Sequence, residues 1–223
     1  MARLYMARLK IKRPSVTLIG AMSPDGKIAT KTGDSRISSQ KDLSTLHRIR
    51  ASHDGVMIGV GTLLRDNPHL TVRHVKGKSP TRIVVDSTAR TSPNANIFKT
   101  PNIIIAVSSR APKHRLRRLQ QAGAQIIQAG KFKVNLRTLM ARLHQLGIRS
   151  VLLEGGGTLN WSMISNRLVD SIVLTIAPFI IGGYRATTLV DGEGISKINR
   201  AIRLTLVKSK RQNDDVVLSY RVR

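Results

Sequence analysis

An acidic residue and three glycines stand directly after a short apolar run. Residues 151–153 are Val-Leu-Leu, Glu154 follows, and Gly155, Gly156 and Gly157 come before a helical pattern. Backbone N–H groups at the start of a helix bind phosphates, and glycine lets a ligand approach the backbone closely. In open α/β sheets, ligands bind at the carboxyl ends of the strands. The segment therefore predicts a phosphate site with a carboxylate beside it; a tight turn without a ligand is the alternative.

A second candidate region follows the apolar run of residues 56–60. Thr62 is placed to cap the short helix expected next and to present its hydroxyl group to a phosphate. Asp66 stands just before Pro68, where a carboxylate either positions a ligand or caps a turn. Arg73 lies beyond this turn, and its planar guanidinium group can hold a phosphate with two hydrogen bonds. We therefore interpret Thr62 and Arg73 as candidate phosphate ligands.

A third candidate region is a glycine-containing loop near the N-terminus. The apolar residues 16–22 end at Ser-Pro-Asp-Gly, residues 23–26, and the chain then reaches Gly-Asp-Ser at residues 33–35. Long loops of this kind are often lids over a site and often only connections between elements. Both interpretations stay open for this loop.

Strand-like and helical patterns alternate along most of the chain. We expect strands at residues 16–22, 56–60, 82–85, 103–107, 125–127 and 151–153. We expect helices from about Ser39 through Arg50, from Pro112 to Gly123, over residues 136–146, and after the glycines through Leu168. Two long β runs, residues 171–178 and 216–222, end the chain, with only turns expected between them. This order predicts an α/β fold whose mostly parallel central sheet is flanked by helices and gains antiparallel C-terminal strands.

Length and composition exclude several classes of protein. The chain has 223 residues, of which 41% are hydrophobic, which suits one α/β domain with a sizeable core. There is no cysteine, so disulfides, thiol nucleophiles and cysteine-held zinc are excluded. The six histidines lack a metal-binding spacing, and we expect no metal.

The ends of the chain and its apolar runs bear on location. The longest nearly apolar run, residues 172–181, is shorter than the roughly 20 residues that cross a bilayer, so no membrane partner is expected. Residues 1–13 carry five cationic side chains and no acidic one, and we interpret them as a solvated arm rather than a transit or signal peptide. We therefore expect a basic arm over residues 1–14, a single domain over residues 15–223 and a cytoplasmic protein.

The formal net charge of +26, from 38 Lys and Arg against 12 Asp and Glu, raises a nucleic-acid alternative. No acidic residue lies between Asp86 and Glu154, a stretch that contains Arg90, Lys99, Arg110, Lys113, Arg115, Arg117, Arg118, Lys131, Lys133, Arg137, Arg142 and Arg149. The few aromatic residues are scattered rather than interleaved with these cations, which argues against a base-stacking surface. A basic face that attracts phosphorylated small molecules, and nucleic acid only non-specifically, is the favoured interpretation.

The three candidate regions together resemble one known family. Their order and spacing are similar to the reductase domain of riboflavin biosynthesis, in the dihydrofolate-reductase-like superfamily. The matching segments are SPDGKIA and GDS (23–29, 33–35), TLLRDNP and LTVR (62–68, 70–73), PTRIVVDS (80–87), EGGGTL (154–159) and PFIIGG (178–183). The resemblance covers roughly residues 16–220 and implies reduction of a ribosylaminopyrimidine 5′-phosphate to its ribitylamino product by NADPH, in a homodimer.

The resemblance also implies roles for individual residues. The family's NADP contacts fall on Met22, Thr62, Asp66, Ser87 and the glycine-led segment, including Gly155, Gly156, Gly157, Thr158 and Leu159. Its substrate contacts fall on Ser35, Arg50, Leu70, Arg73 and Glu154. Glu154 is the catalytic candidate near the sugar C1′ and Asp66 a positioning candidate in the catalytic set, while Arg50 and Arg73 would clamp the 5′-phosphate. From charge and helix-start geometry, residues 108–110, Ser-Ser-Arg, are our candidate for the adenosine 2′-phosphate.

The substrate itself leaves alternatives. Bacterial members are commonly fused to a zinc deaminase, whose metal ligands this cysteine-free chain lacks. We therefore expect the still-aminated substrate, 2,5-diamino-6-ribosylamino-4(3H)-pyrimidinone 5′-phosphate, with the deaminated 5-amino-6-ribosylaminouracil 5′-phosphate as the alternative. A dihydrofolate-type reductase and a nucleic-acid-binding protein are the remaining alternatives.

Overall fold

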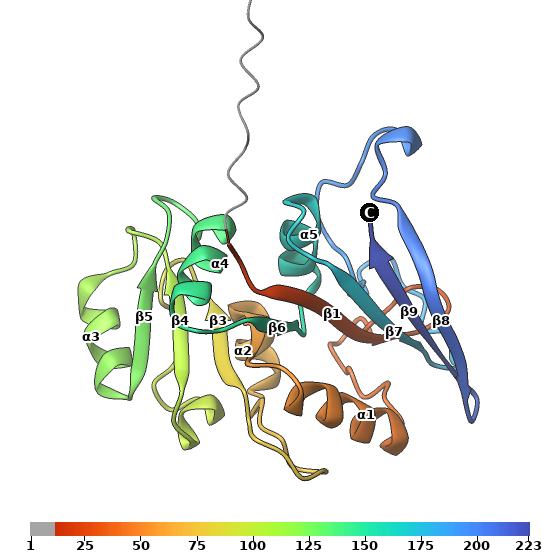
Figure 1. Cartoon of the computed structure of the whole chain (residues 1–223), viewed down its shortest axis with the longest axis horizontal. Helices are drawn as coiled ribbons and strands as arrows, with labels where there is room; N and C mark the ends of the chain where they lie inside the picture. Colours follow the sequence, from red (N-terminus) through yellow and green to blue (C-terminus); the bar gives the residue numbers. More distant parts are fainter. Residues whose placement is uncertain (1–11) are drawn as a thin grey trace, which may run out of the picture.

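The structure is a computed structural model, and it describes residues 12–223. These residues form one nine-stranded sheet with helices on both faces (Figure 1). Most of the predicted basic arm, residues 1–11, lies outside the described residues. The strand order is β5-β4-β3-β2-β6-β1-β7-β9-β8. The strands are β1 (Ser15–Met22), β2 (Gly55–Gly59), β3 (Thr81–Val85), β4 (Ile103–Val107), β5 (Ala124–Gln128), β6 (Ser150–Leu153), β7 (Ser171–Ile176), β8 (Leu204–Gln212) and β9 (Asp215–Val222).

The sheet is mostly parallel. Among themselves, strands β1 to β7 pair in parallel, whereas β9 pairs antiparallel with both β7 and β8. The fold prediction, a parallel sheet extended by antiparallel C-terminal strands, is therefore confirmed. Its functional consequence is that the carboxyl ends of β1, β2 and β6 lie side by side at one edge of the sheet.

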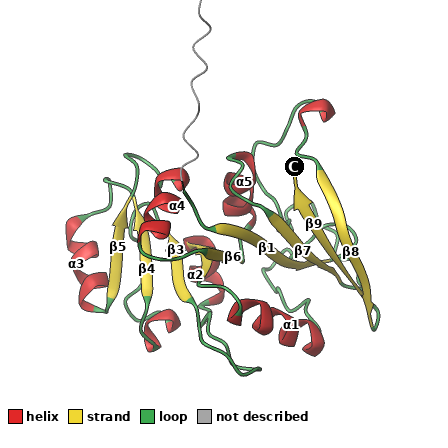
Figure 2. Cartoon of the chain, in the orientation of Figure 1, coloured by secondary structure: helices red, strands yellow, loops and turns green. Residues whose placement is uncertain are grey.

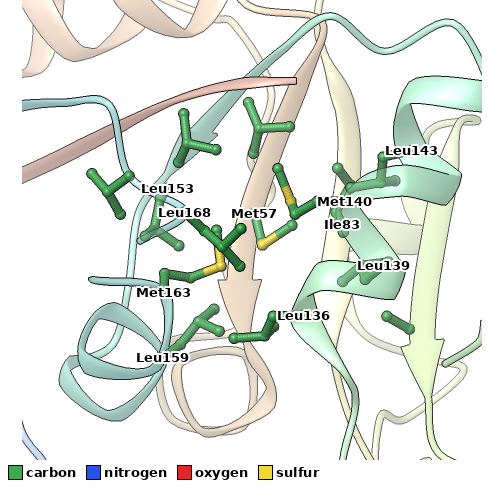
Figure 3. Packing of buried hydrophobic residues seen from close by; sticks show 14 of the residues in the cluster. Met57, Ile83, Leu136, Leu139, Met140, Leu143, Leu153, Leu159, Met163 and Leu168 are labelled. Atoms are coloured by element: carbon green, nitrogen blue, oxygen red, sulfur yellow. The ribbon is translucent and has the colours of Figure 1, made fainter. Parts of the chain in front are cut away.

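Two apolar clusters hold helices against opposite faces of the sheet. The α-helices are α1 (Gln40–Ala51), α2 (Val60–Asp66), α3 (Lys113–Gln121), α4 (Leu136–Gln145) and α5 (Gly157–Ser165). Leu139 and Met140 of α4 and Met163 of α5 pack against strand side chains such as Met57 on one face (Figure 3). Leu63 of α2 and Leu119 of α3 pack on the other face with the alternate strand residues. This alternation follows from the opposite directions of successive side chains in a strand.

The C-terminal part differs from the sequence-based expectation. Only turns were expected between the last two β runs, but β8 lies there and forms a hairpin with β9 (Figure 2). Most side chains of β8 are exposed, so its sequence lacks the apolar alternation that marks a half-buried strand. Asn213, with a φ of 58°, forms the turn, and this conformation is one that Asn tolerates.

Helix α5 is shorter than predicted. It was expected to continue through Leu168 but ends at Ser165. Arg167 adopts a φ of 58°, and the N–H of Leu168 donates to the carbonyl of Met163, which is the left-handed termination common at helix ends. No described helix is long and apolar enough to cross a membrane.

Candidate active site

The segment after β6 that contains the three glycines forms backbone hydrogen bonds with β2 at two successive residues, Glu154 and Gly155. The N–H of Glu154 donates to the carbonyl of Met57 at 2.9 Å, and the carbonyl of Gly155 accepts from the N–H of Gly59 at 2.8 Å. Gly155 has a φ of 92°, which glycine adopts without a steric penalty, and the peptide bond that follows it is cis. These hydrogen bonds fix the backbone where the chain leaves the sheet, and they place Glu154 at the carboxyl end of β6.

Thr62 holds the next residue of this segment. Its Oγ1 accepts a hydrogen bond from the N–H of Gly156 at 2.9 Å. The predicted capping role of Thr62 is wrong, because α2 begins directly after β2 at Val60, with Gly59 as its N-cap and no side-chain cap from the described residues. Thr62 instead lies in the first turn of α2, where its side chain links α2 to the start of α5.

A cavity of about 1020 Å³ lies at this edge of the sheet. Its walls come from the start of α2, the end of β3, the loop before α4 and the start of α5, together with Thr187 and Asp191. Six of the predicted cofactor residues line it: Thr62, Ser87, Gly156, Gly157, Thr158 and Leu159. Ligand sites of this kind usually measure about 300–1,000 Å³, so the volume suits a large ligand such as a dinucleotide.

The first turn of α5 faces this cavity with free backbone donors. Gly156 is the N-cap, and no described side chain caps the helix. The N–H groups of Gly157, Thr158 and Leu159 belong to the first turn, so they have no partner within the helix. A Cβ atom on Gly157 would lie 2.6 Å from Oδ2 of Asp191 and 2.8 Å from the carbonyl oxygen of Thr188. Glycine is therefore needed there, and the donor groups suit a phosphate.

The other predicted cofactor residues lie outside the lining of the cavity. Met22 is half-buried at the end of β1 and packs against the larger core cluster. The carboxylate of Asp66 pairs with the guanidinium of Arg65 at 2.8 Å. Gly155 is turned toward Asn160, whose side chain lies 3.3 Å from the position of a Cβ atom on this glycine. Roles for Met22, Asp66 and Gly155 remain predictions.

The structure does not favour residues 108–110 as a 2′-phosphate site. Ser108 is buried, and its hydroxyl donates to the carbonyl of Ser87 at 2.7 Å. The hydroxyl of Ser109 donates to the carbonyl of Lys131 at 3.2 Å, and Arg110 lies over the ring of Phe132. None of these three residues is in the cavity lining, whose cationic members are Arg65, Arg90, Lys133 and Arg137.

Arg50 and Glu154 form a buried, two-bonded ion pair. Nε of Arg50 donates to Oε1 of Glu154 at 2.9 Å, and Nη2 donates to Oε2 at 2.8 Å. Nη1 of Arg50 donates to the carbonyl of Thr71 at 2.8 Å. The two side chains are only 6% and 12% exposed, so the ion pair is well shielded from water. In this structure Arg50 orients Glu154 and the loop before β3, while its predicted contact with a phosphate stays a prediction.

The remaining predicted substrate residues lie in different environments. Arg73 is exposed and forms no ion pair with a described residue, so its guanidinium group is available to a ligand. Ser35 is also exposed. Leu70 is 3% exposed with its side chain in the second core cluster and has a φ of 56°. A contact of Leu70 with substrate would therefore use its backbone.

His47 is a site residue that sequence reasoning missed. It is 2% exposed, and its Nδ1 accepts a hydrogen bond from the backbone N–H of Arg73 at 3.1 Å. Burial, reinforced by the charges of Arg50, His74 and Arg73, lowers the pKa of His47 to about 4. The available signal was its position three residues before Arg50 on one helix, because residues at this spacing share a helix face.

The loop after β1 is pinned to the segment that follows β7. The N–H of Ile28 donates to the carbonyl of Thr187 at 2.9 Å, and the carboxylate of Asp25 accepts from the N–H of Gly182 at 2.7 Å. Hydrogen bonds from the Ser23 side chain and from Gly182 lower the pKa of Asp25 to about 2. Thr187 and Asp191 line the cavity, so this loop supports one of its walls. The sequence had not indicated Asp191.

Proteins of known name are similar to this chain over most of its length. A protein of Methanothermobacter thermautotrophicus named 2,5-diamino-6-ribosylamino-4(3H)-pyrimidinone 5′-phosphate reductase is 45% identical over 216 residues, 95% of this chain and 99% of that protein. A protein of the same name from Aquifex aeolicus is 39% identical, over 88% of this chain and 91% of its own length. The riboflavin biosynthesis protein RibD of Actinobacillus pleuropneumoniae is 34% identical over 97% of this chain, which spans 59% of that protein.

Solved structures show the same fold. RibD of Acinetobacter baumannii superposes with a TM-score of 0.83 at 24% identity, over 95% of this chain and 58% of that one. Dihydrofolate reductase of Enterococcus faecalis superposes with a TM-score of 0.53 at 12% identity, over 93% of this chain and 96% of that one. The family model described as the RibD C-terminal domain matches residues 14–218. The resemblance stated from the sequence is thereby confirmed, and the chain belongs to the RibD C-terminal domain family.

Proposed function

We propose that this protein reduces the ribosyl group of 2,5-diamino-6-ribosylamino-4(3H)-pyrimidinone 5′-phosphate with NADPH, giving the ribitylamino product in riboflavin biosynthesis. The names of the archaeal and Aquifex relatives support the aminated substrate. The observation that carries the proposal is the large cavity at the start of α5. Glu154, which is held by the buried Arg50, precedes the cavity residue Gly156 by two positions. Our expectation of a cytoplasmic protein stays a prediction.

The residues of the cavity fit a dinucleotide phosphate. The backbone donors of Gly157, Thr158 and Leu159 suit the pyrophosphate, and the absence of a Cβ atom at Gly157 keeps this turn close to the Asp191 segment. Arg90 and Lys133 line the same cavity and form no ion pair with described residues, which suits them to the 2′-phosphate. The bound cofactor supplies the hydride that reduces C1′ of the sugar.

The protein's own groups orient the substrate. Arg50 donates to both carboxylate oxygens of Glu154 and so fixes the orientation of this carboxylate. Lone pairs that remain on Glu154 can accept hydrogen bonds from substrate groups next to C1′. Arg73 offers its exposed guanidinium to the 5′-phosphate. The task of the chain is to align the reacting carbon with the cofactor, at a separation of about 3–3.5 Å.

A spectrophotometric assay tests this proposal. The purified chain is expected to oxidise NADPH when the aminated ribotide is added, and more slowly with the deaminated ribotide. Glu154→Gln is expected to lower kcat at least tenfold while NADPH affinity stays within about twofold, because the cofactor cavity is not lined by this residue. No turnover of either ribotide by the wild-type chain would refute the proposal.

Two controls in that assay address the alternatives. Dihydrofolate replaces the ribotide to test a dihydrofolate-type reductase, an alternative that the structural likeness to such an enzyme keeps relevant. Duplex DNA and RNA binding, titrated against salt, tests the nucleic-acid alternative suggested by the net charge of +26. Turnover restricted to the ribotide, with only weak and steeply salt-dependent nucleic-acid binding, supports the reductase.

We further propose that the chain forms a homodimer through β8 and β9. Leu204, Leu206 and Val207 of β8 and Val216 of β9 are 40–60% exposed, which is unusual for apolar strand residues unless another surface covers them. Light scattering is expected to give the mass of two chains for the wild type and of one chain for Leu206→Asp. The matched control, Leu146→Asp, changes a leucine of similar exposure at the end of α4 and should leave the dimer intact. A wild-type monomer would contradict the proposal.

A further inference from the structure

Helix α1 forms two hydrogen bonds with the backbone of the loop before β3. Arg50 donates to the carbonyl of Thr71 at 2.8 Å, and His47 accepts from the N–H of Arg73 at 3.1 Å. His47 and Arg50 are three residues apart and so lie on one face of α1. One face of the helix therefore supplies a donor and an acceptor to the two peptide groups that flank Val72.

The hydrogen bond to Arg73 requires an unprotonated Nδ1 on His47. Because Nδ1 accepts a backbone N–H, this bond assigns the ring proton of neutral His47 to Nε2. The charged and titratable groups around the ring are Arg50 of α1 and Arg73 and His74 of the loop, and His74 makes an edge contact at 4.5 Å between ring centroids. All three disfavour a positive charge on His47, in addition to its burial. His47 therefore remains an acceptor at neutral pH.

We infer that His47 is a positioning residue for substrate binding, which fixes the backbone of Arg73 so that its guanidinium group meets the substrate phosphate. This inference rests on the proposed function, because Arg73 is assigned to the phosphate there. Without the acceptor, the N–H of Arg73 loses its partner, and of the two hydrogen bonds from α1 to this loop only the one to Thr71 remains. The side chain of Arg73 is long and exposed, so small movements of its backbone are amplified at the guanidinium group.

The same geometry argues against a role for His47 in proton transfer during the reaction. Its Nδ1 is engaged with a backbone group, and a histidine with a pKa of about 4 carries no proton to donate at neutral pH. Loss of the His47 contact should therefore weaken substrate binding and leave the chemical step unchanged. Cofactor binding should also be unchanged, because neither His47 nor Arg73 lines the large cavity.

A matched pair of substitutions tests the inference. In His47→Asn the side-chain oxygen replaces Nδ1 as acceptor, whereas in His47→Gln the oxygen reaches the position of Nε2. We expect His47→Gln to raise KM for the ribotide about fivefold to tenfold, as the loss of one hydrogen bond of about 1 kcal/mol implies. His47→Asn should keep KM within about threefold of wild type. In both variants kcat and KM for NADPH should remain within about twofold. His144→Gln, which changes a partly exposed histidine on α4, is the control.

Calorimetric binding of the ribotide without NADPH gives a second readout that needs no turnover. The dissociation constant should follow the same order, with wild type and His47→Asn tighter than His47→Gln. Equal effects of Asn and Gln, or no effect of either in folded variants, would overturn the role of Nδ1. A wild-type chain that binds the ribotide but does not reduce it would refute the proposed function and leave this inference standing. A wild-type chain that does not bind the ribotide refutes both.

Discussion

At the scale of single residues, the structure explains the glycine at position 157 by the atoms around it. A Cβ atom there would lie closer than 3 Å to Asp191 and to the carbonyl of Thr188. Gly61, in the first turn of α2, also lines the cavity, yet a Cβ atom on it would meet nothing within 4 Å. A side chain at position 157 would therefore clash with its neighbours, whereas one at position 61 would point into open space.

Gly157→Ala is expected to lower the free energy of unfolding by about 1–3 kcal/mol, because Asp191 and Thr188 must move to admit the methyl group. It should also weaken NADPH binding, since the displaced segment forms a wall of the cavity. Urea denaturation and a fluorescence titration with NADPH measure the two effects. Gly61→Ala should not destabilise the protein, because alanine favours helices by up to about 1 kcal/mol. Equal stability of Gly157→Ala and wild type would contradict the expected clash.

Residue types near the site were readable from the sequence, but their pairing was not. Glu154 and Arg50 were both predicted as site residues, and their separation by 104 positions gives no sign of a direct bond. Their ion pair depends on β6 lying beside β2 and on the approach of α1 to that edge. His47 escaped notice for the same reason, since its partner is a backbone group that the fold brings to it.

At the scale of elements, buried strands and capped helices were predicted well. The apolar runs that became β2, β4 and β6 are short and bounded by turn residues, and Ser39 caps α1 as expected, with its hydroxyl accepting from the N–H of Asp42. The exposed strand β8 was not predicted. β8 has little buried surface, so its sequence obeys no strict alternation, and pairing with β9 alone makes it a strand.

The parallel order of the strands explains why separate segments form one site. β6 lies between β1 and β2 although it begins only at Ser150, long after these strands end at Met22 and Gly59. This insertion places the glycines after β6 next to the end of β2, where Gly59 and Thr62 bond to them. The cavity lies where the ends of β2 and β3 meet the segment after β6, and no single segment contains it.

At the scale of the whole molecule, many of the positively charged side chains lie outside the candidate site. Helix α3 carries Lys113, Arg115, Arg117 and Arg118, none of which lines the large cavity. A field of this sign attracts anionic ligands over distances comparable to the Debye length, about 10 Å at 0.1 M salt. The basic face therefore suits the capture of phosphorylated substrate and cofactor.

We expect kcat/KM for the ribotide to fall about tenfold or more as ionic strength rises, while kcat changes little, because screening acts on the encounter of charged molecules. Steady-state kinetics over a salt series measures this slope. Replacing Lys113 and Arg117 with Gln should flatten the slope, since both lie on α3 outside the cavity lining. A salt-independent kcat/KM would exclude steering as the role of this charge.

The sequence by itself determined the fold class, the family and the glycine-led segment after Glu154, because these depend on local patterns of apolar residues, turns and motifs. Tertiary structure alone decided which side chains meet. It pairs Arg50 with Glu154, brings the hydroxyl of Thr62 to the N–H of Gly156, and brings Nδ1 of His47 to the N–H of Arg73. The physical reason is that such contacts join residues distant in sequence, and their geometry follows from strand order and helix packing rather than from any local pattern.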